Sequence, residues 1–298
     1  MLPLAKRKSE EMGRKSALIG LHSAVLLFGV AGLFGKWLTL PPMWIVLGRT
    51  TVAATALGLV RTTARDRWPP FDARLIASGG ILACHWVAFF AAVQIADVAT
   101  ALLGYASFPL FVLLLERVFL KRHWSAREAA VALLVSAGLV LLVPEFSLDN
   151  RIVQGLALGV LSGFTFALLA VMNRTWVAAR PAMDVAFWQD AWAAVALLPF
   201  AVMSGKAPEI GQREIALLLV LGIVCTALAH TLFITSLKTL TAHTASVVAA
   251  LEPVYGIALA LVLLGEIPGW RTLAGAVLIV GAAIFATWHD SVARQQSR

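Results

Sequence analysis

Long apolar segments constrain this chain more than any other feature. Of its 298 residues, 60% are hydrophobic and only 13% are charged, whereas the surface of a soluble protein usually carries far more charge. A helix needs about 20 apolar residues to cross the hydrocarbon core of a bilayer. The sequence therefore predicts an all-α integral membrane protein with ten transmembrane helices and short loops. The ten spans are expected at residues 16–35, 41–60, 74–95, 98–119, 126–143, 152–173, 182–203, 213–235, 243–264 and 270–288.

The distribution of Lys and Arg predicts how these spans are oriented. Cytoplasmic loops of membrane proteins are enriched in Lys and Arg. With both termini in the cytoplasm, 18 of the 24 basic residues fall on the inner side and five on the outer side, with Arg49 left inside a span. We therefore expect a multi-pass membrane protein with both termini cytoplasmic. Most of this bias comes from the first half of the chain.

Two stretches about 144 residues apart look like copies of one motif. The first runs from Ser107-Phe108-Pro109-Leu110 to Leu120-Lys121-Arg122, and the second from Leu251-Glu252-Pro253-Val254 to Leu264-Gly265-Glu266. Five spans is an odd number, so two tandem copies of five spans must be inverted relative to each other. Inverted repeats are typical of secondary transporters. We expect a cytoplasmic segment at 1–15, repeats at 16–145 and 146–288, and a cytoplasmic tail at 289–298.

These motifs resemble the drug/metabolite transporter superfamily, in its ten-helix branch with EamA domains. The second copy carries the better match, including Gly275 and Gly281 in the last span, whereas Lys121-Arg122 replaces the Gly-Glu pair in the first. Within that branch the chain is similar to amino acid exporters of the YddG type. The resemblance implies ten helices around a central cavity and two halves that gate alternately. It also implies export of small neutral or aromatic amino acids across the bacterial inner membrane. Spans five and ten would be peripheral.

Charged side chains at membrane depth normally face a cavity or a partner. Glu252 lies near the midplane of span nine, where it would bind a substrate ammonium or a proton, or pair with a neighbouring helix. Arg49 in span two would meet a substrate carboxylate, pair with Asp190 in span seven, or extend to the membrane interface. Asp190 has the same alternatives of substrate binding and pairing.

Histidine and aromatic residues form the second group of candidates. His85-Trp86 in span three and His230 in span eight fall at nearly matching repeat positions, and histidine can bind substrate, relay protons or pack through hydrogen bonds. Aromatic side chains near the prolines or at similar depth would form an adaptable wall for substrate or serve in packing. These are Tyr105, Phe108, Tyr255 and Trp188. Pro109 and Pro253 are candidate hinges.

Small residues and cysteines are expected to serve packing. Gly155, Gly159 and Gly163 recur every four residues and predict one closely packed helix face. Cys84 and Cys225 lie within apolar runs, and such cysteines are usually buried. Two cysteines cannot form a disulfide scaffold.

Missing motifs exclude several function classes. The sequence has no P-loop, no metal-ligand spacing and no hydrolase motif, so no cofactor, metal ion or catalytic residue is expected. The basic residues form no continuous stripe, so a nucleic-acid-binding protein is not expected. Span one has no acidic residue, unlike small multidrug exporters of similar fold. The expected partners are a small-molecule substrate and the lipid bilayer, and the sequence is compatible with a monomer. Two alternatives remain: a transporter of other metabolites or drugs, and an intramembrane lipid-modifying enzyme.

The charge asymmetry predicts that Lys121 faces the cytoplasm and Glu266 the outside. Single cysteines at these positions, in a background lacking Cys84 and Cys225, should react with a membrane-impermeant maleimide from opposite sides. Labelling of both positions from the same side would contradict the inverted repeat.

Overall fold

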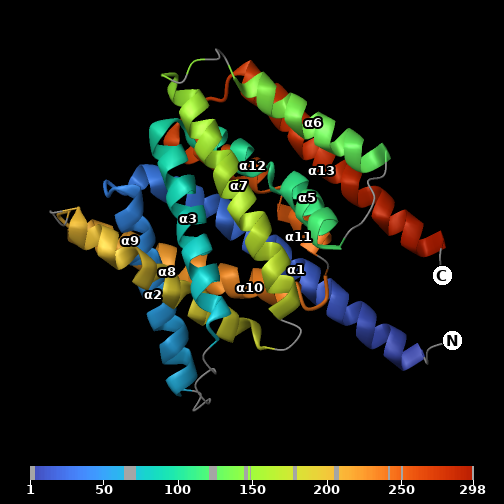
Figure 1. The fold of residues 1–298 in the computed structure, drawn as a ribbon, viewed down its shortest axis with the longest axis horizontal. Helices are drawn as coiled ribbons and strands as arrows, with labels where there is room; N and C mark the ends of the chain where they lie inside the picture. Colours follow the sequence, from blue (N-terminus) through green and yellow to red (C-terminus); the bar gives the residue numbers. More distant parts are fainter. Residues whose placement is uncertain are drawn as a thin grey trace.

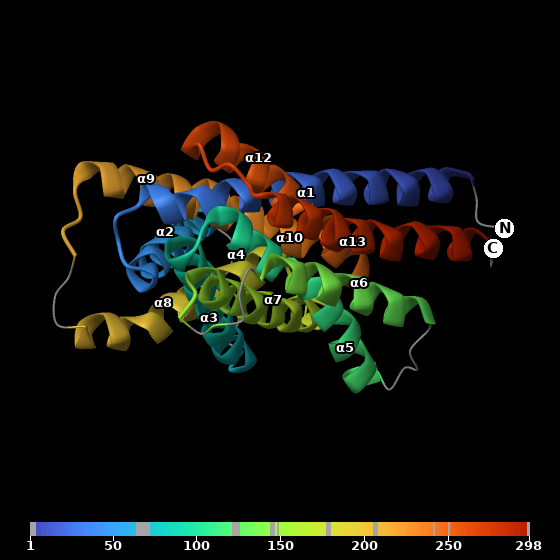
Figure 2. The same ribbon diagram turned by 90° about the horizontal axis from the view of Figure 1, so that it is seen from above.

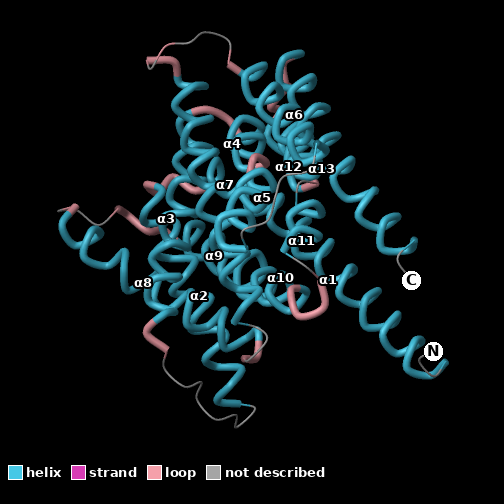
Figure 3. Tube along the Cα trace, turned by 45° about the vertical axis from the view of Figure 1, so that its right-hand side comes forward, coloured by secondary structure: helices cyan, strands magenta, loops and turns pink. Residues whose placement is uncertain are grey.

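The computed structural model describes residues 4–63, 72–120, 126–143, 147, 149–176, 180–204, 208–240, 242–249 and 251–296. All regular secondary structure in these ranges is helical, as expected, and the described loops are short (Figures 1 and 3). Lys121 and Arg122 lie outside the described residues. Seven helical segments in the described part are long and apolar enough to cross a membrane, and shorter apolar helices run over Ala130–Leu142, Glu252–Leu264 and Trp270–Ala282.

The helices confirm the predicted ten spans. Seven spans are single helices: α1 (Leu4–Trp37), α2 (Pro42–Thr63), α3 (Arg74–Ile95), α6 (Ala126–Leu142), α7 (Arg151–Trp176), α8 (Ala182–Met203) and α13 (Trp270–Gln296). Three spans are interrupted. Span four consists of α4 (Val98–Tyr105) and α5 (Phe108–Leu120). Span eight consists of α9 (Gln212–Gly222), the π-helix η1 (Ile223–Leu228) and α10 (Ala229–Ser236). Span nine consists of α11 (Ala242–Ala249) and α12 (Glu252–Leu264).

The two repeats exchange helices in a matched way. The first helix of the first repeat, α1, packs on α10 and α12 of the second repeat, while the first helix of the second repeat, α7, packs on α3, α4 and α5 of the first. The last helices of the two repeats, α6 and α13, pack against each other along one side and run in opposite directions (Figure 1). The first helix and the last helix extend to the same end of the molecule (Figure 2). This arrangement is an inverted pair of five-helix repeats.

The two prolines of the repeated motif, Pro109 and Pro253, lie where one helix ends and another begins. Pro109 is the second residue of α5 and Pro253 the second residue of α12. Proline has no N–H to donate and its fixed φ suits the first turn of a helix, so it starts a new helix at each break. Before Pro109 the backbone remains satisfied, because Ala106 N donates to Leu102 O at 2.9 Å and Ser107 Oγ donates to Gly104 O at 2.7 Å.

Glycines allow α7 to approach span four at backbone distance. A Cβ atom at Gly159 would lie 2.9 Å from Ala101 O and 3.0 Å from Gly104 Cα, and one at Gly163 would lie 2.7 Å from Tyr105 O. These distances confirm the closely packed face predicted from the glycine spacing. The cysteine prediction was half right, since Cys225 is buried whereas Cys84 is exposed on the outer face of α3. An apolar run in a membrane helix has a lipid-facing side, and Cys84 lies on it.

Polar contacts join the helix ends on both sides of the molecule. On one side Arg61 of α2 forms an ion pair with Asp184 of α8, and Asp72 pairs with Arg180 at 3.1 Å. On the other side Glu266 accepts a hydrogen bond from Val98 N at 3.1 Å and lies 3.9 Å from Lys36 Nζ. Burial raises the pKa of Glu266, opposed by the hydrogen bond from Val98 and the charge of Lys36.

Replacing Gly159 by Ala should destabilise the protein, because the new methyl group meets backbone atoms that cannot move aside. We expect a loss of about 1–3 kcal/mol, seen as a lower midpoint of thermal unfolding in detergent. Gly80→Ala is the matched control, since a Cβ there meets nothing within 4 Å. Equal midpoints for the two variants would show that α7 and span four are not packed as described.

Candidate functional site

A narrow pocket lies at the centre of the helix assembly. Its free volume is about 30 Å³, which is room for one or two water molecules. Spans one, two, three, four, six, eight and nine all contribute to its lining. The lining residues are Phe28, Ala31, Arg49, Leu82, His85, Trp86, Phe89, Tyr105, Phe166, His230 and Glu252. Six of the ten residues predicted to bind substrate are therefore brought together here.

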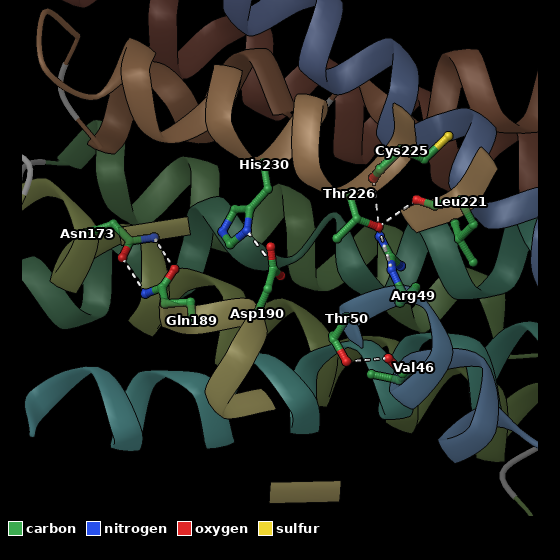
Figure 4. A network of polar contacts seen from close by, with 10 residues as sticks. All are labelled: Val46, Arg49, Thr50, Asn173, Gln189, Asp190, Leu221, Cys225, Thr226 and His230. Carbon is green, nitrogen blue, oxygen red and sulfur yellow. Dashed lines mark hydrogen bonds and ion pairs between the residues drawn. The ribbon is translucent and has the colours of Figure 1, made fainter. Parts of the chain in front are cut away.

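Arg49 is the cation of the pocket lining, and its side chain is held by the π-helix. Its Nε donates to Thr226 Oγ1 at 2.9 Å and its Nη2 donates to Cys225 O at 3.2 Å (Figure 4). The guanidinium carbon lies 4.1 Å from the ring centroid of Trp86. Arg49 is only 2% exposed, and no carboxylate among the described residues forms an ion pair with it. The alternative in which Arg49 pairs with Asp190 is therefore not realised.

The π-helix explains why these acceptors point toward Arg49. Within η1 the hydroxyl of Thr226 donates to Leu221 O, five residues earlier, at 2.7 Å. The wider π turn changes the direction of the following carbonyls and side chains, and such turns occur frequently at functional sites. Cys225 O is thereby free to accept a hydrogen bond from another helix. Sequence analysis missed this contact because no residue pattern distinguished η1 from α-helix.

Glu252 is the first residue of α12 and is buried in the pocket wall. Tyr105 lines the same pocket, and the partial positive charge of the helix N-terminus favours a negative group at the position of Glu252. No donor among the described residues reaches its Oε2 atom. One carboxylate oxygen thus remains available to a group in the pocket.

The two histidines face the same pocket but have different partners. His85 Nδ1 lies 2.9 Å from both the carbonyl oxygen and the hydroxyl of Ser162, and its ring stacks on Phe166 with centroids 4.9 Å apart. His230 Nδ1 lies 3.7 Å from Asp190 Oδ1, and its ring packs edge-on against Trp86. His85 and His230, which fall at nearly matching positions of the two repeats, therefore both line the pocket.

Aromatic rings form most of the remaining wall. Phe166 is at the centre of this group, with ring centroids 5.5 Å from Tyr105 and 5.1 Å from both Phe108 and Phe233. Phe28, Phe89 and Phe166 were missed by sequence analysis. A phenylalanine in an apolar helix looks the same whether it faces lipid, a neighbouring helix or a cavity, so no signal in the sequence could have identified them.

The other predicted residues lie away from the pocket lining. Phe108 is fully buried behind Tyr105 and stacks on it at 5.8 Å, while Asp190 lies behind His230. Trp188 stacks on Trp192 along α8, and Tyr255 packs its Cβ atom close to Gly29 of α1. The candidate hinges Pro109 and Pro253 stand at the starts of α5 and α12, beside the pocket residues Tyr105 and Glu252.

Comparison with known proteins identifies the fold and the family. A solved crystal structure superposes with a TM-score of 0.70 at 21% identity, covering 92% of this chain and 98% of that one, which shows a common fold. The chain is 24% identical over 280 residues to the uncharacterized transporter YxxF of Bacillus subtilis, covering 91% of this chain and 89% of that protein.

Relatives with a named cargo match a shorter part of the chain. The S-adenosylmethionine uptake transporter of Rickettsia bellii is 28% identical over 200 residues, which is 67% of each chain. The EamA-like transporter family matches twice, over residues 15–143 and 153–288, and so covers most of the sequence. The ten-span inverted fold and these two matches together show that the chain belongs to the EamA-like transporter family, within the drug/metabolite transporter superfamily.

Proposed function

We propose that this transporter carries small zwitterionic amino acids through its central pocket by alternating access of the two repeats. The observation that carries the proposal is the charge arrangement of the pocket. Arg49 and Glu252 are both buried and line the same pocket. Among the described residues, Arg49 has no ion-pair partner and Oε2 of Glu252 has no hydrogen-bond donor. An α-amino acid offers one group of opposite charge to each.

Arg49, which has no ion-pair partner among the described residues, supports the proposal most strongly. A buried charge without a counterion is costly, so it persists only where other contacts or a ligand compensate. Two of the five guanidinium N–H donors of Arg49 are used by Thr226 and Cys225. A substrate carboxylate would supply the missing countercharge through the remaining donors, and guanidinium–carboxylate hydrogen bonds are among the strongest in proteins.

The other end of the substrate is matched by Glu252 and the aromatic wall. An ammonium group carries three donors, and Oε2 of Glu252 is an acceptor that the protein leaves open. The faces of Trp86, Phe89 and Phe166 favour an apolar or aromatic substrate side chain over a charged one.

Alternating access accounts for the small pocket volume. A pocket of about 30 Å³ is too small for an amino acid, so loading requires the helices around it to separate. The breaks at α4–α5 and α11–α12 are the places where such movement is least costly. The polar contacts around Arg61–Asp184 and around Glu266 would open in turn on opposite sides.

S-adenosylmethionine is a second candidate cargo. The Rickettsia relatives are named for its uptake, and the molecule contains an α-amino acid group together with a sulfonium cation and an adenine. Aromatic rings bind cations and stack on bases. The rings of Trp86 and Phe166 would then contact the larger part of this cargo.

Uptake into proteoliposomes that contain only this protein tests the proposal. The panel is labelled alanine, tryptophan, S-adenosylmethionine, a sugar and a cationic drug. We expect uptake of the neutral amino acids, with competition by tryptophan but not by tryptophanamide, which lacks the carboxylate. Transport of other panel members without any amino acid would overturn the proposal.

Glu252→Gln should impair amino acid transport while leaving a folded protein. The change keeps the volume but removes the charge that faces the ammonium, and hydrogen bonds to charged groups contribute about 1.5–3 kcal/mol. We expect the apparent KM to rise by roughly 10- to 100-fold. Glu209→Gln, at an exposed position, is the matched control. A folded Glu252→Gln protein with an unchanged KM would show that Glu252 is a packing residue beside Pro253.

Removing an aromatic wall residue should affect large cargo more than small cargo. Trp86→Ala or Tyr105→Ala removes contact area, so transport of tryptophan should weaken by about 1–3 kcal/mol in kcat/KM while transport of alanine changes less. Trp270→Ala, at an exposed site, serves as the control. Equal losses for both amino acids would indicate a general packing defect.

A further inference from the structure

We propose that Asp190 and His230 form a proton-binding pair that couples cargo movement to a proton gradient. The proposal rests on the proposed function for the identity of the cargo, but proton binding by the pair does not depend on it.

The environment of Asp190 is unusual for a buried acid. Its side chain is completely buried in α8, and neither carboxylate oxygen has a hydrogen-bond partner among the described residues. His230 Nδ1 lies 3.7 Å from its Oδ1 atom (Figure 4). That separation suits an ion pair but is too long for a hydrogen bond.

Gln189, the neighbour of Asp190 on α8, is a buried polar residue whose hydrogen bonds are formed. Gln189 is equally buried, and its Nε2 donates to Asn173 Oδ1 at 2.7 Å while its own oxygen accepts from Asn173 Nδ2 at 3.4 Å. This amide pair joins α7 to α8 with its groups satisfied. Within the described part of the chain Asp190 has no comparable partner, so packing alone does not account for an acid at this position.

A single proton removes the cost of this arrangement. A lone buried carboxylate is strongly unfavourable in an apolar interior. When one proton binds and comes to rest on the carboxylate of Asp190, the net charge of the pair changes from −1 to 0. His230 lines the pocket whereas Asp190 lies behind it, so a proton from pocket water reaches His230 first. Transfer onward to Oδ1 requires the two groups to approach by roughly 1 Å.

The charged and titratable groups around the pair connect it to the cargo site. Arg49 of α2 interacts electrostatically with Asp190. His85 of α3 interacts electrostatically with His230. The helix η1 contributes Cys225, and α12 places Glu252 in the same pocket lining as Arg49 and His230. From α1, His22 and Lys15 are exposed.

Arg49 is the shared element between the two sites. A cargo carboxylate on Arg49 changes the electric field at Asp190, so cargo binding and proton binding influence each other. Reciprocal coupling of this kind is a thermodynamic requirement whenever one ligand changes the affinity for another.

Infrared difference spectra of the purified protein, recorded without cargo between alkaline and acidic pH, test proton binding. We expect a protonated-carboxyl C=O band that is absent from Asp190→Asn and returns at a shifted frequency in Asp190→Glu. Glu252→Gln, which removes the other buried pocket carboxylate, should retain the band. Persistence of the band in a folded Asp190→Asn protein, or its loss only in Glu252→Gln, would overturn the proposal.

Proteoliposomes test coupling, with labelled tryptophan as the probe, or another panel member if only that is transported. In the wild type an imposed pH gradient should drive accumulation, by up to about tenfold per pH unit for one proton per cargo. Asp190→Asn should retain exchange of internal for external cargo but lose accumulation. A wild type that ignores the pH gradient, or an Asp190→Asn variant that still accumulates, would refute coupling. Failure of the amino acid proposal alone would appear as a different cargo with the same dependence on Asp190.

Discussion

Backbone polar groups within hydrocarbon must find their hydrogen bonds inside the protein, and the rest of this structure depends on that constraint. Interrupted helices are tolerated at membrane depth only where they are buried or line a cavity. In the described residues the interruptions fall in spans four, eight and nine, around one pocket. Tyr105 ends α4, Thr226 lies within η1, and Glu252 begins α12. The same departures from regular helix that create unsatisfied groups also place the polar atoms of the site.

Arg49 illustrates how this constraint leads to selectivity. Its guanidinium is stabilised by a hydroxyl and a carbonyl of the π-helix and by the face of Trp86, without an acidic partner. Neutral acceptors and an aromatic face fix its orientation while leaving its charge unneutralised. An acidic partner in contact would have satisfied the cation permanently and left no reason to bind an anionic group. Under the proposed function, the absence of a carboxylate in contact with Arg49 among the described residues is what leaves the cation open to a cargo carboxylate, even though Glu252 lines the same pocket.

The fold could be predicted far more fully than the site. Span length, charge asymmetry and the repeated proline motif depend on local composition, and each predicted the ten-span inverted architecture. Position along a span also gives depth in the bilayer, which is why Arg49, His85, Tyr105, His230 and Glu252 were identified. Depth does not say which way a side chain points around the helix axis. Trp188 and Tyr255 have suitable depths but lie outside the pocket lining, and the phenylalanines of the wall carry no distinguishing pattern.

Pairing of Arg49 with Asp190 was one of the alternatives that the sequence left open, and the two residues form no ion pair in the described structure. The axis that relates two inverted repeats lies in the membrane plane, so it carries a position at one depth to the mirrored depth on the other side of the axis. Corresponding spans therefore need not bring their charged residues into contact. The repeat makes the packing of the two halves alike, as the exchange of α1 and α7 between them shows. Similar packing allows two access states of similar free energy, as alternating access requires. The polar partners of corresponding residues differ between the two repeats, because His85 contacts Ser162 whereas His230 faces Asp190. In the mechanism that we propose, a symmetric scaffold would provide the movement, and a few unsymmetrical side chains would determine which cargo binds and whether a proton moves with it.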